Sequence, residues 1–102
     1  MYMYVDDVRT APPYSDVIAK DYASAIRILK LLPIEILDLD YAMGPGGNGL
    51  QILEYMVANG IKVKKIKVHS DHSIGRPKMI EYINDHKDIL LRKWDVLNEK
   101  TN

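Results

Sequence analysis

The chain lacks cysteine altogether, which excludes a disulfide framework and a thiolate zinc site and fits a reducing cytoplasm. It has no apolar run near the roughly 20 residues of a membrane-spanning helix. Its start has no basic segment leading into an apolar one, as an export signal would. The 14 basic and 14 acidic residues cancel, so no overall charge attracts the chain to duplex DNA or to a membrane surface. We therefore expect a cytoplasmic single domain of 102 residues with one core and no membrane partner.

Apolar patterning predicts four strands and three helical stretches. The expected strands are residues 2–5, 17–19, 34–39 and 63–70, and the expected helices are residues 22–32, 50–59 and a stretch that starts at residue 75. Asp21 is expected to cap the first helix and Gly60 to close the second. Strands that alternate with helices favour a parallel sheet with right-handed crossovers. Because lysines alternate with Ile66 and Val68, the last strand is expected at an edge of the sheet.

The C-terminal helical stretch carries one apolar stripe. Its members are Met79, Ile83, Leu90, Trp94 and Leu97. A polar run at residues 84–88 is expected to divide the stretch into two helices, and no strand follows it. Trp94 offers a side chain for an interface, and a short sheet with a long terminal helix is a reason to consider a homodimer.

Carboxylates follow two of the predicted strands. Asp6 and Asp7 end the first strand, and Asp40 ends the third. If these strands are neighbours in a parallel sheet, the three acids converge at the edge where such sheets bind ligands. Crowded carboxylates repel one another unless a cation lies between them, and Mg²⁺ prefers carboxylate and water oxygens. We favour a Mg²⁺ site over the alternative, in which the acids are solvated, start a turn or pair with Arg9.

A further acid, Asp38, lies on the same predicted strand as Asp40. Side chains two residues apart on a strand share a face, so Asp38 points the same way but lies deeper in the sheet. We expect it to have a structural role, with a hydrogen bond to a tyrosine or a lysine, rather than to bind a metal.

The loop after the fourth strand combines groups that suit phosphate chemistry. His69 and Ser70 close the strand, His72 follows, and Arg76 comes just before Pro77 at the start of the predicted helix. A hydroxyl, two imidazoles and an arginine can bind a phosphate and move a proton. The same composition is typical of a plain helix N-terminus, and two histidines without further paired ligands indicate zinc only weakly. Composition alone favours the plain helix N-terminus.

Three segments, in this order along the chain, resemble the cyclic-phosphate processing receiver domains. Residues 6–13 read Asp-Asp-Val-Arg-Thr-Ala-Pro-Pro, residues 39–44 read Leu-Asp-Tyr-Ala-Met-Gly, and residues 69–79 read His-Ser-Asp-His-Ser-Ile-Gly-Arg-Pro-Lys-Met. The family's motifs are similar: Asp-Asp-x-Arg-Thr-Pro-Pro, Leu-Asp-His-Asp-Leu-Gly and His-Ser-x-Asn-x-x-Gly-Arg-x-x-Met. The resemblance covers residues 1–83 and leaves residues 84–102 as a helical extension. More loosely, the chain also resembles the receiver domains of response regulators.

This resemblance implies a fold and a set of functional residues. The fold is a compact receiver-like (flavodoxin-like) α/β domain of three layers, with a mostly parallel four-stranded sheet of order 2-1-3-4, a C-terminal helix and no fifth strand. The implied site holds Mg²⁺ on Asp6, Asp7 and Asp40. At this site we expect Arg9 and Arg76 to bind phosphate oxygens and His69 or His72 to transfer a proton, with Ser70 orienting the substrate.

The chain departs from the family's motifs at three positions. Tyr41 and Ala42 stand where the family has histidine and aspartate, and His72 stands where it has asparagine. The leading hypothesis is a Mg²⁺-dependent phosphoesterase that binds or hydrolyses a cyclic phosphate on a small nucleotide or an RNA end. One alternative is a signalling receiver phosphorylated on Asp40, although the lysine that ends a receiver's fifth strand has no counterpart here. The other is an interaction module that has kept the fold and lost the chemistry.

Overall fold

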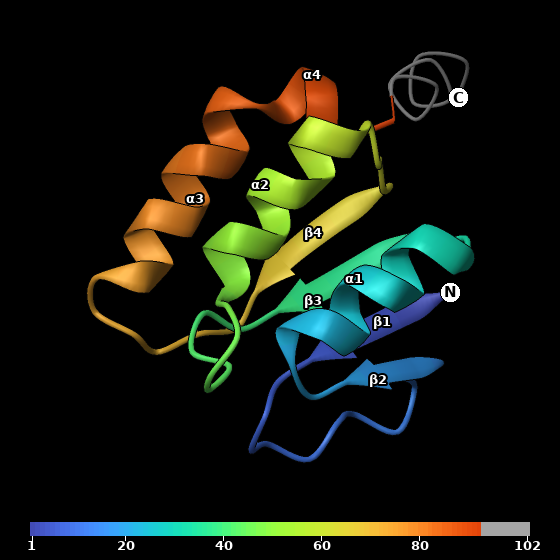
Figure 1. Ribbon diagram of the computed structural model, residues 1–102, viewed down its shortest axis with the longest axis vertical. Coiled ribbons are helices and arrows are strands. Elements are labelled where there is room, and N and C mark those ends of the chain that lie inside the picture. Colours follow the sequence, from blue (N-terminus) through green and yellow to red (C-terminus); the bar gives the residue numbers. More distant parts are fainter. Residues whose placement is uncertain (93–102) are drawn as a thin grey trace.

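Four short strands form one parallel sheet in the computed structural model, which describes residues 1–92 (Figure 1). The strands are β1 (Tyr2–Val5), β2 (Val17–Ala19), β3 (Ile36–Leu39) and β4 (Lys65–Val68). Their order is β2-β1-β3-β4, and all three neighbouring pairs are parallel. The predicted order and the edge position of the last strand are therefore confirmed. The third and fourth strands are shorter than expected because their pairing runs only from Ile36–Lys65 to Leu39–Val68.

The helices begin and end close to the residues that the sequence indicates. They are α1 (Tyr22–Leu31), α2 (Gly49–Asn59), α3 (Gly75–Asp85) and α4 (Lys87–Leu90). The Asp21 side chain accepts a hydrogen bond from the backbone N–H of Ser24 (2.7 Å), and Gly60 ends α2 in the left-handed conformation with φ 66°. The last stretch divides at His86, inside the polar run expected to break it.

The apolar side chains of the sheet face the helices. Met3 and Val5 on β1 and Leu37 and Leu39 on β3 are fully buried and belong to a core that includes residues of α1, α2, α3 and α4. These four side chains share one face because side chains alternate along a strand. The helices contact one another in a single layer over that face, as Figure 1 shows.

The opposite face of the sheet carries Tyr2, Tyr4, Asp38 and Lys67. Among residues 1–92 no helix covers this face, so two layers of regular structure are present where the receiver-like fold led us to expect three. The physical reason is the connection from β1 to β2, which contains adjacent prolines at residues 12 and 13 and forms a loop in place of a helix.

The described chain ends beside the start of β4. Leu91 forms one parallel bridge with Val63, and Arg92 N–H donates to Val63 O (3.1 Å). Residues 1–92 contain no fifth strand beyond this bridge, and none of their helices is long and apolar enough to cross a membrane. Trp94 and Leu97, which were expected to extend the apolar stripe, lie outside the described residues.

Candidate functional site

The carboxyl ends of β1, β3 and β4 bring Asp6, Asp40 and His69 together. One ligand atom from each lies within 4.8 Å of the other two, a spacing that suits a shared metal ion. Backbone hydrogen bonds extend the sheet to these residues, because Asp40 N–H donates to Val5 O and His69 N–H donates to Leu39 O, both at 3.1 Å. The hydrogen bonding of the sheet therefore fixes the backbone positions of Asp40 and His69.

Asp6 is a buried carboxylate that is hydrogen-bonded through both oxygens. Oδ1 accepts from the backbone N–H groups of Val8 and Arg9 (2.9 Å each), and Oδ2 lies 2.9 Å from His69 Nε2. Burial raises the pKa of Asp6, but the two backbone donors and His69 outweigh burial and hold this pKa below its usual value. One oxygen thus stabilises the turn after β1, while the other faces the cluster. Asp6 therefore combines the two roles that the sequence left open, a turn residue and a candidate metal ligand.

Asp40 is held by the loop that follows it. Its Oδ1 accepts from Tyr41 N–H (2.8 Å), and Oδ2 accepts no hydrogen bond from residues 1–92. Gly49 N–H closes the loop by donating to Tyr41 O (2.8 Å), and a Cβ at Gly49 would lie 2.1 Å from Asp40 O. Only glycine fits at this position, because any Cβ would overlap Asp40 O. Gly49 therefore allows the first residue of α2 to lie directly against the backbone of Asp40.

His69 lies between two carboxylates. Its Nδ1 is 2.6 Å from Asp38 Oδ1 and its Nε2 is 2.9 Å from Asp6 Oδ2. The ring stacks on Tyr4 with centroids 4.6 Å apart and an angle of 7° between the planes. The plane and the rotation of the imidazole are therefore both fixed.

The structure confirms the structural role expected of Asp38. Asp38 is buried, and its Oδ2 accepts a hydrogen bond from the Tyr2 hydroxyl. Burial and the hydrogen bond to Asp38 raise the pKa of Tyr2, which keeps its hydroxyl protonated and able to donate. Sequence reasoning did not connect Asp38 to His69. The usable signal was the period of two, which places Tyr2 and Tyr4 on β1 and Asp38 on β3 on the same face as Asp6 and Asp40.

Asp7 is not among the three clustered side chains. It is exposed, and its Oδ2 is 3.7 Å from where a Cβ on Gly44 would lie, so it faces the glycine-rich loop. The cluster consists of Asp6, Asp40 and His69 without Asp7. The role of Asp7 as a metal ligand stays a prediction.

Ser70 and His72 hold the turn between β4 and α3. The buried Ser70 Oγ accepts from His72 N–H (3.1 Å). His72 Nδ1 accepts from the backbone N–H groups of Ile74 (3.3 Å) and Gly75 (2.8 Å) at the start of α3. With these bonds both residues stabilise the start of α3, as expected of a plain helix N-terminus. Their catalytic roles stay predictions.

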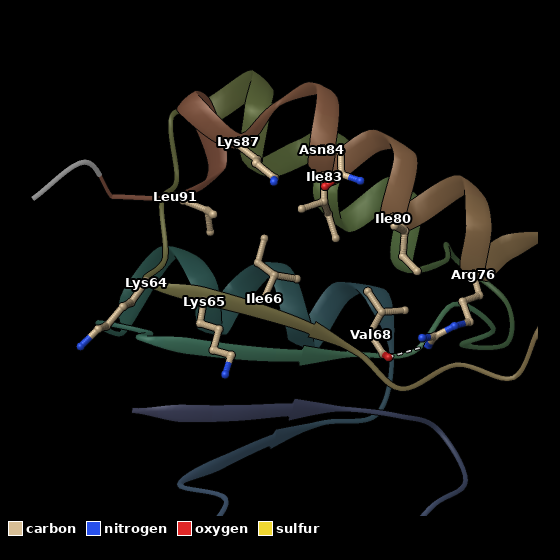
Figure 2. A pocket seen from close by; sticks show the side chains of 10 residues that line it. All are labelled: Lys64, Lys65, Ile66, Val68, Arg76, Ile80, Ile83, Asn84, Lys87 and Leu91. Atoms are coloured by element: carbon tan, nitrogen blue, oxygen red, sulfur yellow. Dashed lines mark hydrogen bonds between the residues drawn. The ribbon is translucent and has the colours of Figure 1, made fainter. Parts of the chain in front are cut away.

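Two arginines donate hydrogen bonds to backbone carbonyls at the end of β4 and in the turn after it. Arg9 Nη1 donates to His69 O (2.9 Å), and Nη2 forms an ion pair with Asp71. Arg76 Nη1 donates to Val68 O (2.7 Å), the dashed line in Figure 2. Arg76 also lies on the rim of a groove of about 350 Å³ between β4 and α3, which is separate from the acid cluster. Binding of phosphate by Arg9 and Arg76 stays a prediction.

Tyr41 and Ala42, where the chain departs from the motif, have different surroundings. The Tyr41 ring packs against Gly75, where a Cβ would lie 2.2 Å from a ring carbon, and against His72, with centroids 4.7 Å apart. Asn48 Nδ2 donates to the Tyr41 hydroxyl (3.4 Å). Tyr41 therefore joins two loops by packing, whereas Ala42 is exposed.

Comparison with known proteins identifies the family. The profile of the cyclic-phosphate processing receiver domain matches residues 1–85, and the chain belongs to this family. No curated protein and no solved structure matches it. The parallel sheet of order 2-1-3-4 is the one that the family resemblance predicted.

Proposed function

We propose that the domain binds Mg²⁺ at Asp6 and Asp40 and uses this site to bind and hydrolyse a cyclic nucleotide phosphate. The observation that carries the proposal is the convergence of Asp6, Asp40 and His69 within 4.8 Å at the carboxyl end of the sheet. Ligands of open parallel sheets bind at this end. Membership of the cyclic-phosphate processing family supports the substrate class.

The donor set fits Mg²⁺. One or two carboxylates, completed by water and phosphate oxygens, are its usual protein ligands. The Oδ1 atoms of both acids accept backbone hydrogen bonds, so each acid offers Oδ2: that of Asp40 accepts no hydrogen bond from residues 1–92, and that of Asp6 is shared with His69 Nε2. When bound at such a site, Mg²⁺ neutralises phosphate charge and lowers the pKa of coordinated water.

The chain's own residues supply the remaining chemistry. Hydrolysis adds one water across a phosphorus–oxygen bond of the cyclic ester, and the ribose oxygen that leaves must gain a proton. His69 Nε2 is the imidazole atom that faces the cluster, and it is suited to donate that proton. Arg9 lies 4.0 Å from Asp6 through Nε, which puts its guanidinium close enough to bind a phosphate oxygen.

A direct assay tests this function. The chain is incubated with 2′,3′-cyclic nucleotides and cyclic dinucleotides, with Mg²⁺ or with a chelator, and products are separated chromatographically. We expect turnover that requires Mg²⁺ and is lost in Asp40→Ala, while Asp85→Ala, which alters an exposed acid at the end of α3, retains it. Neither turnover nor Mg²⁺-dependent nucleotide binding by the wild type would rule out the proposal.

One observation favours a second candidate, a phosphoacceptor receiver. Asp40 is half-buried at the end of β3, and its Oδ2 accepts no hydrogen bond from residues 1–92, as a phosphoacceptor oxygen requires. Treatment with a small phosphodonor and Mg²⁺ would then add one phosphoryl group, a gain of about 80 Da in the mass spectrum. Absence of this adduct in the wild type, or its persistence in Asp40→Asn, would exclude phosphorylation at Asp40.

A further inference from the structure

Asp38 is a buried acid that the proposed chemistry does not use. The motif shared with the family begins at Leu39, so the resemblance assigns this position no role. Asp38 is 5% exposed, and both of its oxygens have partners: His69 Nδ1 at 2.6 Å and the Tyr2 hydroxyl. A carboxylate this deep in the sheet is tolerated because it is hydrogen-bonded on both sides.

Strand register explains why Asp38 reaches these two partners. Asp38 is level with Tyr4 on β1 and with Lys67 on β4. Tyr2 lies two residues before Tyr4, and His69 lies two residues after Lys67, so both share the face of Asp38 on neighbouring strands. From its place on β3, Asp38 therefore contacts one residue of β1, Tyr2, and one residue that follows β4, His69.

The consequence falls on the direction of the His69 ring. A carboxylate oxygen only accepts hydrogen bonds, so the nitrogen that faces it has to carry the proton. Asp38 thus accepts a hydrogen bond from Nδ1 and turns Nε2, the atom proposed to give up its proton, toward Asp6, 2.9 Å away, while stacking on Tyr4 fixes the ring plane. Without Asp38 the ring would keep its stacking surface and its contact with Asp6, and it would lose one of the two contacts that set its rotation.

We infer that Asp38, itself held by Tyr2, is a positioning residue that orients His69 toward the Asp6–Asp40 cluster. This arrangement corresponds to the carboxylate–histidine pairs that set the ring direction in metal sites. The effect of Asp38 on metal binding rests on the proposed function. The hydrogen bond itself is measurable without metal.

Proton and ¹⁵N NMR of the metal-free full chain tests the hydrogen bond. We expect a slowly exchanging, far-downfield proton on His69 Nδ1 in the wild type. This signal is lost in Asp38→Ala and retained in Asp85→Asn, a matched change of an exposed acid. Asp38→Asn, which can still accept from Nδ1, keeps the fold and restores part of the signal. An unchanged His69 spectrum in Asp38→Ala would overturn the inference.

Calorimetric titration with Mg²⁺ then tests the consequence. Outer partners of metal sites change affinity about 10- to 100-fold, so we expect Asp38→Ala to bind Mg²⁺ at least tenfold more weakly than Asp85→Asn does, with Asp38→Asn between the two. Equal affinities would contradict a positioning role. If the wild type itself binds no Mg²⁺, the proposed function fails, while the NMR result still decides whether Asp38 orients His69.

Discussion

His69 Nε2 lies 2.9 Å from Asp6 Oδ2, which joins the end of β4 to the end of β1 across the strand between them. This contact places an imidazole where the sequence led us to expect a third carboxylate. It also means that both oxygens of Asp6 already have partners within the chain. Asp6 is therefore important for the fold as well as for the proposed chemistry.

Replacement of Asp6 by alanine should destabilise the fold strongly. The change leaves two backbone N–H groups and His69 without their acceptor, and loss of one partner of a buried, charged hydrogen-bonded set costs about 3 kcal/mol. Asp7→Ala is the matched control, because the adjacent acid is exposed and should have a much smaller effect. Urea unfolding measures both free energies. Similar losses for the two variants would contradict the account of Asp6.

Acid should weaken the fold through Asp6. Its pKa is lowered in the folded chain from the ordinary value of 3.8, so the carboxylate contributes stability that is fully present above that value. The contribution is lost as the pH falls below 3.8 toward the lower folded pKa. The stability difference between the wild type and Asp6→Asn, from urea unfolding, should be constant from neutral pH to about pH 5 and shrink below pH 3.8.

The exposed acids Asp21 and Glu35 also have lowered pKa values, Asp21 through the Ser24 N–H and Glu35 through the N-terminal ammonium. They are present in both proteins of the comparison, so their contributions cancel. A stability difference that stays constant down to pH 3 would show that Asp6 is not the acid-sensitive group.

Tyr41 and Gly75 should be energetically coupled. A methyl group at Gly75 would overlap the Tyr41 ring, so Gly75→Ala forces the ring out of its place between two loops. In a Tyr41→Ala background the same substitution should cost less, with a coupling energy of about 1–3 kcal/mol. A double-mutant cycle by chemical denaturation measures this energy. Additive effects would mean that the ring does not fill this space.

Arg9 should affect ligand affinity more than stability. Its ion pair with Asp71 is exposed, so Arg9→Ala should change the free energy of unfolding little. If Arg9 also binds a phosphate oxygen, the same variant should weaken Mg²⁺-dependent nucleotide binding about tenfold, the size of one charged hydrogen bond. Asp71→Ala, which releases the guanidinium, is the control and should bind at least as well as the wild type. Equal affinities of Arg9→Ala and the wild type would remove Arg9 from the site.

Local signals allowed much of the fold to be predicted. Alternation of strands and helices indicated the parallel sheet, Asp21 and Gly60 marked helix ends, and lysines marked the edge strand. The layer arrangement was harder, because the missing helix between β1 and β2 removes cover from one face. The adjacent prolines at residues 12 and 13 exclude a helix there, but the three layers expected from the resemblance did not take this into account.

The site was predictable in its location but less so in its contacts. The strand ends located Asp6 and Asp40, and sequence order could not show that Asp7 is exposed and lies outside their cluster. The bond between Asp38 and His69 depends on the register of two strands 31 residues apart in the chain. Register is set by the packing of the whole sheet, so no local pattern contains it.

A crystal soaked in Mn²⁺, which takes oxygen ligands as Mg²⁺ does and scatters anomalously, tests the central claim most directly. We expect anomalous density in contact with carboxylate oxygens of Asp6 and Asp40, beside His69, and its loss in crystals of Asp40→Ala. Crystals at saturating Mn²⁺ with no density at this cluster, and with His69 Nε2 still on Asp6, would contradict the account.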